Sequence, residues 1–132
     1  MRLKFMKGSF KILSFLLLMN ACKTGNVHDK LPGVWMLEKV YEYNQDVTKK
    51  HNPMSNRWIE FNKDGTFISD GDPFGRNTGH WKIDPAHSIL FIDSQTEDDD
   101  SEWKIAFTKD QMVWTGIGHP RKENTRLVHK RK

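Results

Sequence analysis

Cys22 is the residue with the clearest chemistry in this chain, because it is the only cysteine and follows a distinctive N-terminal segment. That segment begins with four basic residues, Arg2, Lys4, Lys7 and Lys11. An apolar run from Ile12 to Met19 follows, and the small residue Ala21 stands directly before Cys22. A basic start, a short apolar run and a small residue at the cut are typical of a secretory signal peptide. The run is about half of the roughly 20 apolar residues that a membrane-spanning helix needs.

The residues Leu18, Met19, Asn20, Ala21 and Cys22 resemble the bacterial lipobox, the site cut by lipoprotein signal peptidase. The resemblance implies that residues 1–21 are removed and that Cys22 then carries a thioether-linked diacylglycerol and an acyl chain such as palmitate. It also implies a membrane anchor formed by this N-terminal lipid. We expect the protein in the cell envelope, at the periplasmic face of the outer membrane. The alternative is an ordinary cleaved signal peptide with a cysteine nearby by chance.

Removal of residues 1–21 would leave a chain with no net charge. The full 132-residue sequence has 21 Lys and Arg residues against 17 Asp and Glu residues, and four of the basic ones but none of the acidic ones lie in residues 1–21. The remainder therefore carries 17 charges of each sign, which gives no reason to expect nucleic-acid binding. An acidic block at 93–102 and a basic end at 119–132 are typical of solvated segments. Cation binding and contact with anionic lipid are their functional alternatives.

The side chains that most often catalyse reactions show no catalytic spacing. No serine lies in a Gly-x-Ser-x-Gly turn, and no two histidines have the His-x-x-x-His interval of many metal sites. The six histidines are His28, His51, His80, His87, His119 and His129. Asp70, Gly71 and Asp72 resemble a fragment of a calcium loop without its later acidic ligand. We therefore expect no enzymatic activity, no metal site and no cofactor apart from the covalent lipid.

Alternating apolar and polar residues predict eight short strands and no amphipathic helix of any length. The expected strands cover residues 34–43, 57–62, 66–69, 79–84, 88–93, 102–108, 112–117 and 125–129. Turn residues separate them, such as the hairpin signal Lys63, Asp64, Gly65. The pattern predicts one all-β domain over 31–132, either an antiparallel sandwich or an up-and-down barrel, after a tether at 22–30.

The five tryptophans fall in five different expected strands, so they can share one interior. They are Trp35, Trp58, Trp81, Trp103 and Trp114. A packed core is the first interpretation of these large side chains, and the lining of a ligand cavity is the second. For the second, the candidate lining residues are Trp58, Trp81, Trp103, Ile105, Phe107 and Trp114.

Gly33, Val34 and Trp35 at the start of the first strand resemble the Gly-x-Trp signature of the lipocalin superfamily. The family's other short mark is an arginine on or just after the last strand that covers this tryptophan, and Arg126 is the matching position. The hairpin at 60–67 is also similar to those of small lipocalin-like domains in bacterial lipoproteins. The resemblance implies a small eight-stranded antiparallel up-and-down barrel. In that barrel Gly33, Trp35 and Arg126 would close the floor and would not contact a ligand.

Two functions are consistent with these observations. The first is binding of a small hydrophobic ligand inside the barrel, because eight strands enclose just enough space for one. The second is a packed barrel whose loops at 46–56, 70–78 and 94–100 contact or inhibit a protein partner in the envelope, because loops on a rigid scaffold often carry recognition.

Overall fold

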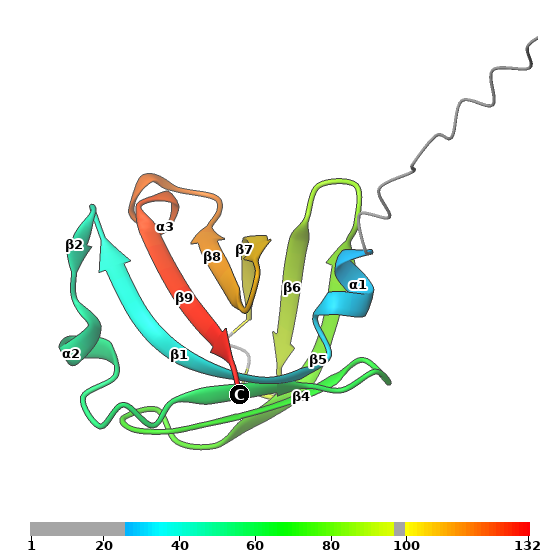
Figure 1. The fold of residues 1–132 in the computed structure, drawn as a ribbon, viewed down its shortest axis with the longest axis horizontal. Helices are drawn as coiled ribbons and strands as arrows, with labels where there is room; N and C mark the ends of the chain where they lie inside the picture. Colours follow the sequence, from blue (N-terminus) through cyan, green and yellow to red (C-terminus); the bar gives the residue numbers. More distant parts are fainter. Residues whose placement is uncertain (1–25, 97–99) are drawn as a thin grey trace, which may run out of the picture.

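The alternation of apolar and polar side chains forms one antiparallel sheet that curls round and closes on itself (Figure 1). This computed structural model describes residues 26–96 and 100–132, so the predicted signal segment and Cys22 lie outside the described residues. The strands are β1 (Gly33–Glu42), β2 (Gln45–Asp46), β3 (Trp58–Phe61), β4 (Thr66–Asp70), β5 (Asn77–Asp84), β6 (Ile89–Ser94), β7 (Ser101–Thr108), β8 (Gln111–Gly116) and β9 (Thr125–Arg131). The helices are single turns, α1 (Val27–Lys30), α2 (Thr48–His51) and α3 (Pro120–Glu123).

Pairing between β1 and β9 closes the barrel. Each of the strands from β3 to β8 pairs with the next one along the chain, β1 pairs with β3, and the register of β1 with β9 runs from Trp35↔Arg131 to Glu42↔Thr125. The predicted eight-stranded up-and-down barrel is thus confirmed, and the sandwich alternative is wrong. The additional strand β2 only extends the end of β1. It forms because Tyr43 and Asn44 both adopt positive φ, as a two-residue hairpin turn requires.

The connections differ sharply between the two ends of the barrel. Because the strands alternate in direction, the connections at 62–65, 85–88 and 109–110 share one end, and those at 43–57, 71–76, 95–100 and 117–124 share the other. All three loops that the sequence singled out therefore belong to the end with the long connections. We call this the open end, and the opposite one the closed end.

A plug of residues before β1 seals the closed end. Leu31 is fully buried in the core, and Val27 of α1 packs against the same cluster. The His28 ring lies 5.1 Å from the Trp81 ring, centroid to centroid. Residues 27–30 were predicted to belong to a tether, but they form a helical turn that covers the barrel. Sequence periodicity missed this turn because it is only four residues long.

The arginine that covers Trp35 is Arg131, which corrects the prediction of Arg126. The Arg131 guanidinium lies 4.1 Å from the Trp35 ring centre, whereas Arg126 lies 5.0 Å from the Tyr41 ring. Trp35 stands near the start of β1, and antiparallel pairing brings the last residues of β9 to it. Arg126 stands five residues before Arg131 on β9, or about 17 Å away along the strand.

Gly33 makes room for this contact at the floor. It adopts a φ of +128°, and a Cβ built there would lie 2.6 Å from the Arg131 Nη1 atom. The Trp35 Nε1–H donates to the Leu31 carbonyl over 2.9 Å. Gly33 and Trp35 thus lie at the barrel floor, where the resemblance placed them.

Aromatic and aliphatic side chains fill the lower barrel. Trp35, Trp81 and Trp114 are all at least nine-tenths buried and share one cluster with Phe61 and Phe67. The Phe61 and Trp81 rings pack edge to face with their centroids 5.8 Å apart, and the Trp81 Nε1–H donates to the Asn62 carbonyl. A packed core is therefore the role of most of the large residues, as the sequence indicated.

A candidate ligand cavity at the open end

Above the packed core, towards the open end, the barrel holds a cavity of about 520 Å³, and the core residues Phe67 and Trp114 form part of its lining. Its apolar wall is formed by inward-facing side chains of five strands, Leu37, Ile59, Phe67, Ile92 and Leu127. Residues of the connection between β4 and β5, Phe74 among them, line its mouth. Ligand sites for small molecules usually measure about 300–1,000 Å³ and combine an apolar wall with a few polar groups. The cavity has the size of such a site, and polar residues, among them Arg57, Asp70 and Asn77, share its lining with the apolar ones.

Two buried polar atoms in the cavity wall have no hydrogen-bond partner among the described residues. They are Nε1 of Trp114, on a residue with 5 % exposure, and Nδ1 of His129, on a residue with 4 % exposure. The two rings are diagonal neighbours on β8 and β9, with their centroids 4.5 Å apart. A buried polar atom without a partner costs about 1–3 kcal/mol. Both atoms have less than 1 Å² of accessible surface, so they are buried within the wall and do not face the cavity.

Arg57 brings a positive charge to the same wall. It lies immediately before β3, is only partly exposed and lines the cavity. The Leu37 amide donates to the Arg57 carbonyl, and Leu37 pairs with His129 across β1 and β9, so Arg57 and His129 flank Leu37 from either side. No carboxylate of the described residues forms an ion pair with Arg57, and burial lowers the pKa of its guanidinium.

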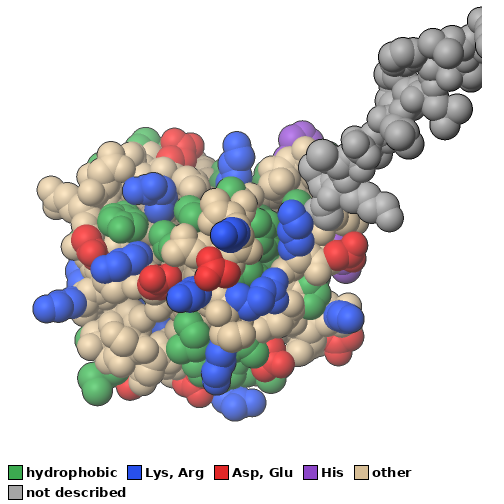
Figure 2. Space-filling model, viewed as in Figure 1, with side chains coloured by type: hydrophobic (Ala, Val, Ile, Leu, Met, Phe, Trp, Pro, Cys, Tyr) green, Lys and Arg blue, Asp and Glu red, His purple; other side chains and the backbone are tan. Residues whose placement is uncertain are grey.

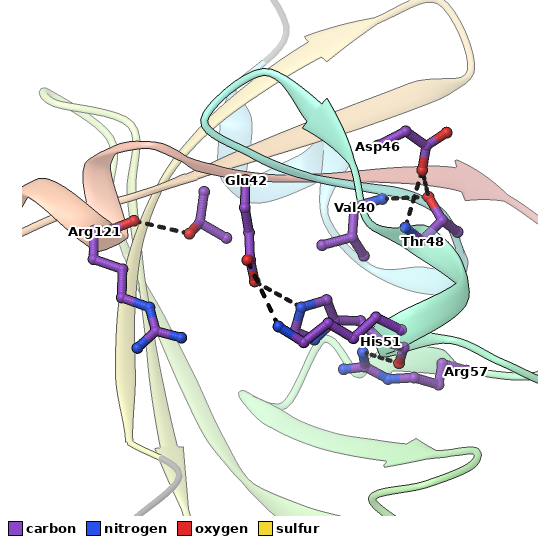
Figure 3. Close-up of polar contacts among 9 residues, drawn as sticks. Val40, Glu42, Asp46, Thr48, His51, Arg57 and Arg121 are labelled. Atoms are coloured by element: carbon purple, nitrogen blue, oxygen red, sulfur yellow. Dashed lines mark hydrogen bonds and ion pairs between the residues drawn. The ribbon is translucent and has the colours of Figure 1, made fainter.

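The loop after β2 holds Arg57 in place (Figure 3). Its Nη1 donates to the His51 carbonyl at the end of α2 over 2.9 Å, and the guanidinium lies 4.6 Å from the Phe74 ring centre. His51 is in turn fixed by Glu42, whose carboxylate lies 2.6 Å from the His51 Nε2 atom. These contacts direct a long, flexible side chain along the mouth of the barrel.

Buried Asn52 joins this loop to the barrel wall. Its amide group donates to the Leu37 carbonyl, and its carbonyl oxygen accepts from the backbone amides of Asn56 and Arg57. Asn52 is 3 % exposed, and each of its three contacts is to the backbone. The position of Arg57 thus depends on a satisfied polar residue beneath it.

The environment of His129 keeps its imidazole uncharged. Burial, and after it the positive charge of Arg57, lower the pKa of His129 from 6.5 to about 3, although a hydrogen bond with the Met112 backbone opposes the shift. With His129 uncharged, the basic side chains of the lining are Arg57 and the exposed Arg76, and Asp70 adds an acidic side chain to the same lining.

The sequence-predicted lining residues divide into two groups. Trp58, Trp103 and Trp114 line the cavity. Trp81 and Ile105 are buried below it in the packed core, and Phe107 packs against that core at the closed end. The assignment of those three as lining residues is therefore corrected. They face inward as expected, but they lie at a depth of the barrel that side chains fill.

The residues that sequence analysis missed are Arg57 and His129. His129 shares the inward face of β9 with Leu127, and this alternation was the sequence signal that could have placed His129 inside the barrel.

The described residues contain no group of three or more acidic, histidine or cysteine side chains that could hold a metal ion.

The face of the molecule in Figure 2 shows no concentration of one charge. On the face in Figure 2, basic and acidic side chains are interspersed. A hollow of about 560 Å³ on the outside of β5, β6 and β7 is lined by charges of both signs, including Lys82, Lys122, Asp93 and Glu102. No helix within 26–96 and 100–132 is long and apolar enough to cross a bilayer.

The fold and the cavity together define a small, closed, up-and-down β-barrel that is sealed at one end and hollow at the other. The crystal structure of a DUF4847 family protein from Bacteroides vulgatus is similar, with a TM-score of 0.54 and 15 % sequence identity. The match covers 77 % of this chain and 94 % of that one, and it shows the fold alone. No family model matches the chain, and no curated protein matches it either.

Proposed function

We propose that this protein is a lipid-anchored, lipocalin-like barrel of the bacterial cell envelope that binds a small hydrophobic ligand and has no enzymatic activity. The observation that carries the binding function is the cavity of about 520 Å³, which is lined by apolar and polar side chains and lies in a barrel whose opposite end is plugged by Leu31 and α1. The anchor rests on the sequence around Cys22, and the barrel supports the lipocalin-like assignment through its Gly33–Trp35 floor.

The geometry of the chain is compatible with both parts of the proposal. Asn26, the first described residue, precedes α1 at the closed end, and Cys22 is four positions before it. Four residues span at most about 14 Å, so a lipid on Cys22 would hold the closed end close to the membrane. The mouth of the cavity would then face away from the bilayer and stay accessible.

Binding is tested on the barrel released from its membrane. Trp103 and Trp114 line the cavity with their ring centroids 5.6 Å apart, so a ligand that enters should change the tryptophan emission. We expect saturable emission changes with medium-chain amphiphiles and a one-to-one complex in native mass spectrometry. The cavity-filling substitution Ser69→Phe should abolish both signals, and Ser88→Ala at the closed end should preserve them. A barrel that binds none of these amphiphiles would refute the function.

A second function is favoured by exposed apolar side chains at the open end. Tyr43, Met54 and Phe74 are 59–67 % exposed, and all three lie in the long connections around the mouth. Such a ring of side chains is suited to contact with an envelope protein, which the protein would bind or inhibit. Under this alternative, replacing Tyr43 and Met54, which do not line the cavity, by serine should abolish capture of a stoichiometric partner while ligand binding stays unchanged.

A further inference from the structure

The outer face of β1 carries apolar side chains where a barrel in water usually carries polar ones. Trp35 and Leu37 are buried in the interior, so the alternation along the strand directs Val34 and Met36 outwards. Both are partly exposed, and neither packs against the core cluster. The outward face of an antiparallel sheet is normally polar, so these two side chains indicate a surface that a partner covers.

The strand register adds two apolar residues and one acid to this surface. Met36 pairs with Trp58, which begins β3 at the mouth of the barrel and also lines the cavity. Val34 pairs with Glu60, and Glu60 pairs with Ile68 of β4. Directly paired residues share one side of a sheet, so all five side chains lie on the outside of the barrel. We call these five residues the β1 face.

Lysines border the β1 face on the side of β9, which runs beside β1 (Figure 1). Lys130 pairs with Met36, and the backbone amide of Lys132 donates to the Val34 carbonyl. Both lysines are exposed, and Glu60 lies on the other side of β1. None of these three charged side chains forms an ion pair with another described residue. The face is thus basic on one side of β1 and acidic on the other.

This distribution of charge is self-complementary. When two copies pack face to face about a two-fold axis that runs along β1, Val34 and Met36 of one copy meet the same residues of the other. Glu60 of each copy then lies opposite the β9 lysines of the other, and Trp58 lies opposite Lys130, in position for a cation–π contact. An axis across the strands would instead bring the lysines of the two copies together, where like charges repel.

We propose that the β1 face binds a second copy of this chain in a two-fold symmetric dimer. Val34, Met36 and Trp58 form its apolar centre, and Glu60 forms ion pairs with the β9 lysines of the other copy. An apolar centre with an aromatic side chain and charges at the rim is the usual anatomy of a protein interface. The dimer goes beyond the proposed ligand binding and does not depend on it, because the β1 face lies on the outside of the barrel.

The dimer axis is compatible with the proposed membrane anchor. A two-fold axis parallel to β1 leaves the direction of β1 unchanged, so the closed ends of both copies point to the same side. Both α1 turns, and with them both Cys22 residues, would then face one bilayer. Two linked anchors hold more firmly than one, because the second inserts at a high effective concentration once the first has inserted.

The test is disulfide cross-linking of the full chain in its own membranes, with copper phenanthroline as the oxidant. Met36→Cys places a thiol on the axis, where it meets its counterpart in the second copy. We expect about fivefold or more covalent dimer than for Phe91→Cys, because a disulfide needs Cα atoms within about 7 Å. Phe91 is the matched control, a partly exposed apolar residue on the outside of β6, across the barrel from β1. Yields are scored above the parent chain, whose only cysteine is Cys22.

Two cysteines off the axis test the two-fold arrangement. Glu60→Cys in one chain and Lys132→Cys in another should give a mixed dimer when the two chains are produced together. Either variant produced alone should give no more dimer than Phe91→Cys, because its two thiols would lie about 10 Å apart across the strands.

Charge reversal in the Met36→Cys chain tests the ion pairs. Glu60→Lys brings like charges together and should lower the yield of dimer about threefold or more. Adding Lys130→Glu and Lys132→Glu should restore the yield to within about twofold, because the pairs form again with their signs exchanged. Lys82→Glu, at the residue paired with Phe91 on β5, is the control and should leave the yield within about twofold.

The outcomes decide the dimer separately from ligand binding. Equal cross-linking of Met36→Cys and Phe91→Cys, or none from Met36→Cys although maleimide labels its thiol, would overturn the dimer. A mixed dimer no more abundant than those of the single variants would overturn the two-fold axis. Cross-linking of Met36→Cys only to a different protein would overturn the second copy as the occupant of the face. If Met36→Cys does not fold, Val34→Cys on the same axis takes its place.

Discussion

The Arg131 guanidinium lies 4.1 Å from the centre of the Trp35 ring, and the two residues are directly paired across the first and last strands of the barrel. Arg131 also donates to the carbonyls of Pro32 and Lys30. One side chain therefore joins the final strand, the first strand and the segment before it. This contact fastens the plug to the floor of the barrel.

Removal of the Arg131 head group should destabilise the barrel without affecting the cavity. Arg131→Met keeps the aliphatic stem but loses the cation–π contact and two hydrogen bonds, so we expect about 1–2 kcal/mol less unfolding free energy. Urea denaturation measures this. Arg126→Met, which affects only the contact with Tyr41, should cost less than about 0.5 kcal/mol. Equal losses in the two variants would contradict a special role for Arg131.

Sequence patterns sufficed to locate all eight barrel strands, because a half-buried strand repeats every two residues and short turns carry Gly, Asn and Asp. They were insufficient to assign the arginine over Trp35. That assignment depends on how far β9 extends and on the irregular register between Leu37 and Lys39, which only the paired strands reveal.

The candidate site was harder to predict than the fold for a physical reason. Some inward side chains fill the barrel, and others surround empty space. The role of each side chain depends on its depth along the barrel axis, and that depth is set by the register between strands far apart in sequence. Trp81 and Trp114 look alike in the sequence, yet the first donates to the Asn62 carbonyl and the second has no partner among the described residues. Arg57 resembled an ordinary strand start.

Buried His129 should make the barrel lose stability in mild acid. The unfolded chain takes up a proton at this residue near pH 6.5, whereas the folded chain, with a pKa of about 3, does not. The contribution of uncharged His129 to the free energy of unfolding is therefore complete above about pH 6.5 and decreases as the pH falls towards 3. The free energy of unfolding should fall by at most about 1.4 kcal/mol per pH unit in this window.

The measurement for His129 is urea denaturation between about pH 7 and about pH 5, where the aspartates with lowered pKa values, Asp46, Asp64 and Asp84, contribute little to the slope because they are almost fully deprotonated in both the folded and the unfolded chain. His129→Phe should flatten the slope, and His119→Gln, at an exposed histidine, should leave it unchanged. A slope that persists in His129→Phe would show that another group is responsible.

Gly79 in the middle of β5 should tolerate no side chain. A Cβ there would collide with the Asp93 carbonyl on β6 and lie 2.9 Å from Cε1 of Phe67 in the core. Gly79→Ala must therefore push β5 and β6 apart or displace a core aromatic ring, and we expect a loss of about 1–3 kcal/mol.

The control variant for Gly79→Ala is Gly75→Ala, in the loop between β4 and β5, where a Cβ would meet no atom within 4 Å. Its positive φ adds a local cost of about 1–2 kcal/mol. Hydrogen exchange distinguishes the two, because only Gly79→Ala should increase exchange of the amides that pair β5 with β6. Unchanged protection of those amides in Gly79→Ala would contradict the steric argument.

Cys22→Ser should detach the protein from the membrane, since serine cannot form the thioether that the proposed lipidation requires. We expect the parent protein to incorporate labelled palmitate and to sediment with membranes. The variant should remain unprocessed or be released as soluble protein. Thr24→Ala, two residues further on, is the control and should leave labelling and sedimentation unchanged. Stable attachment takes two lipid signals, and a diacylglycerol with a third acyl chain exceeds that requirement. Palmitate incorporation by Cys22→Ser, or an unlabelled parent protein that keeps residues 1–21, would refute the anchor but leave binding by the barrel to be judged on its own tests.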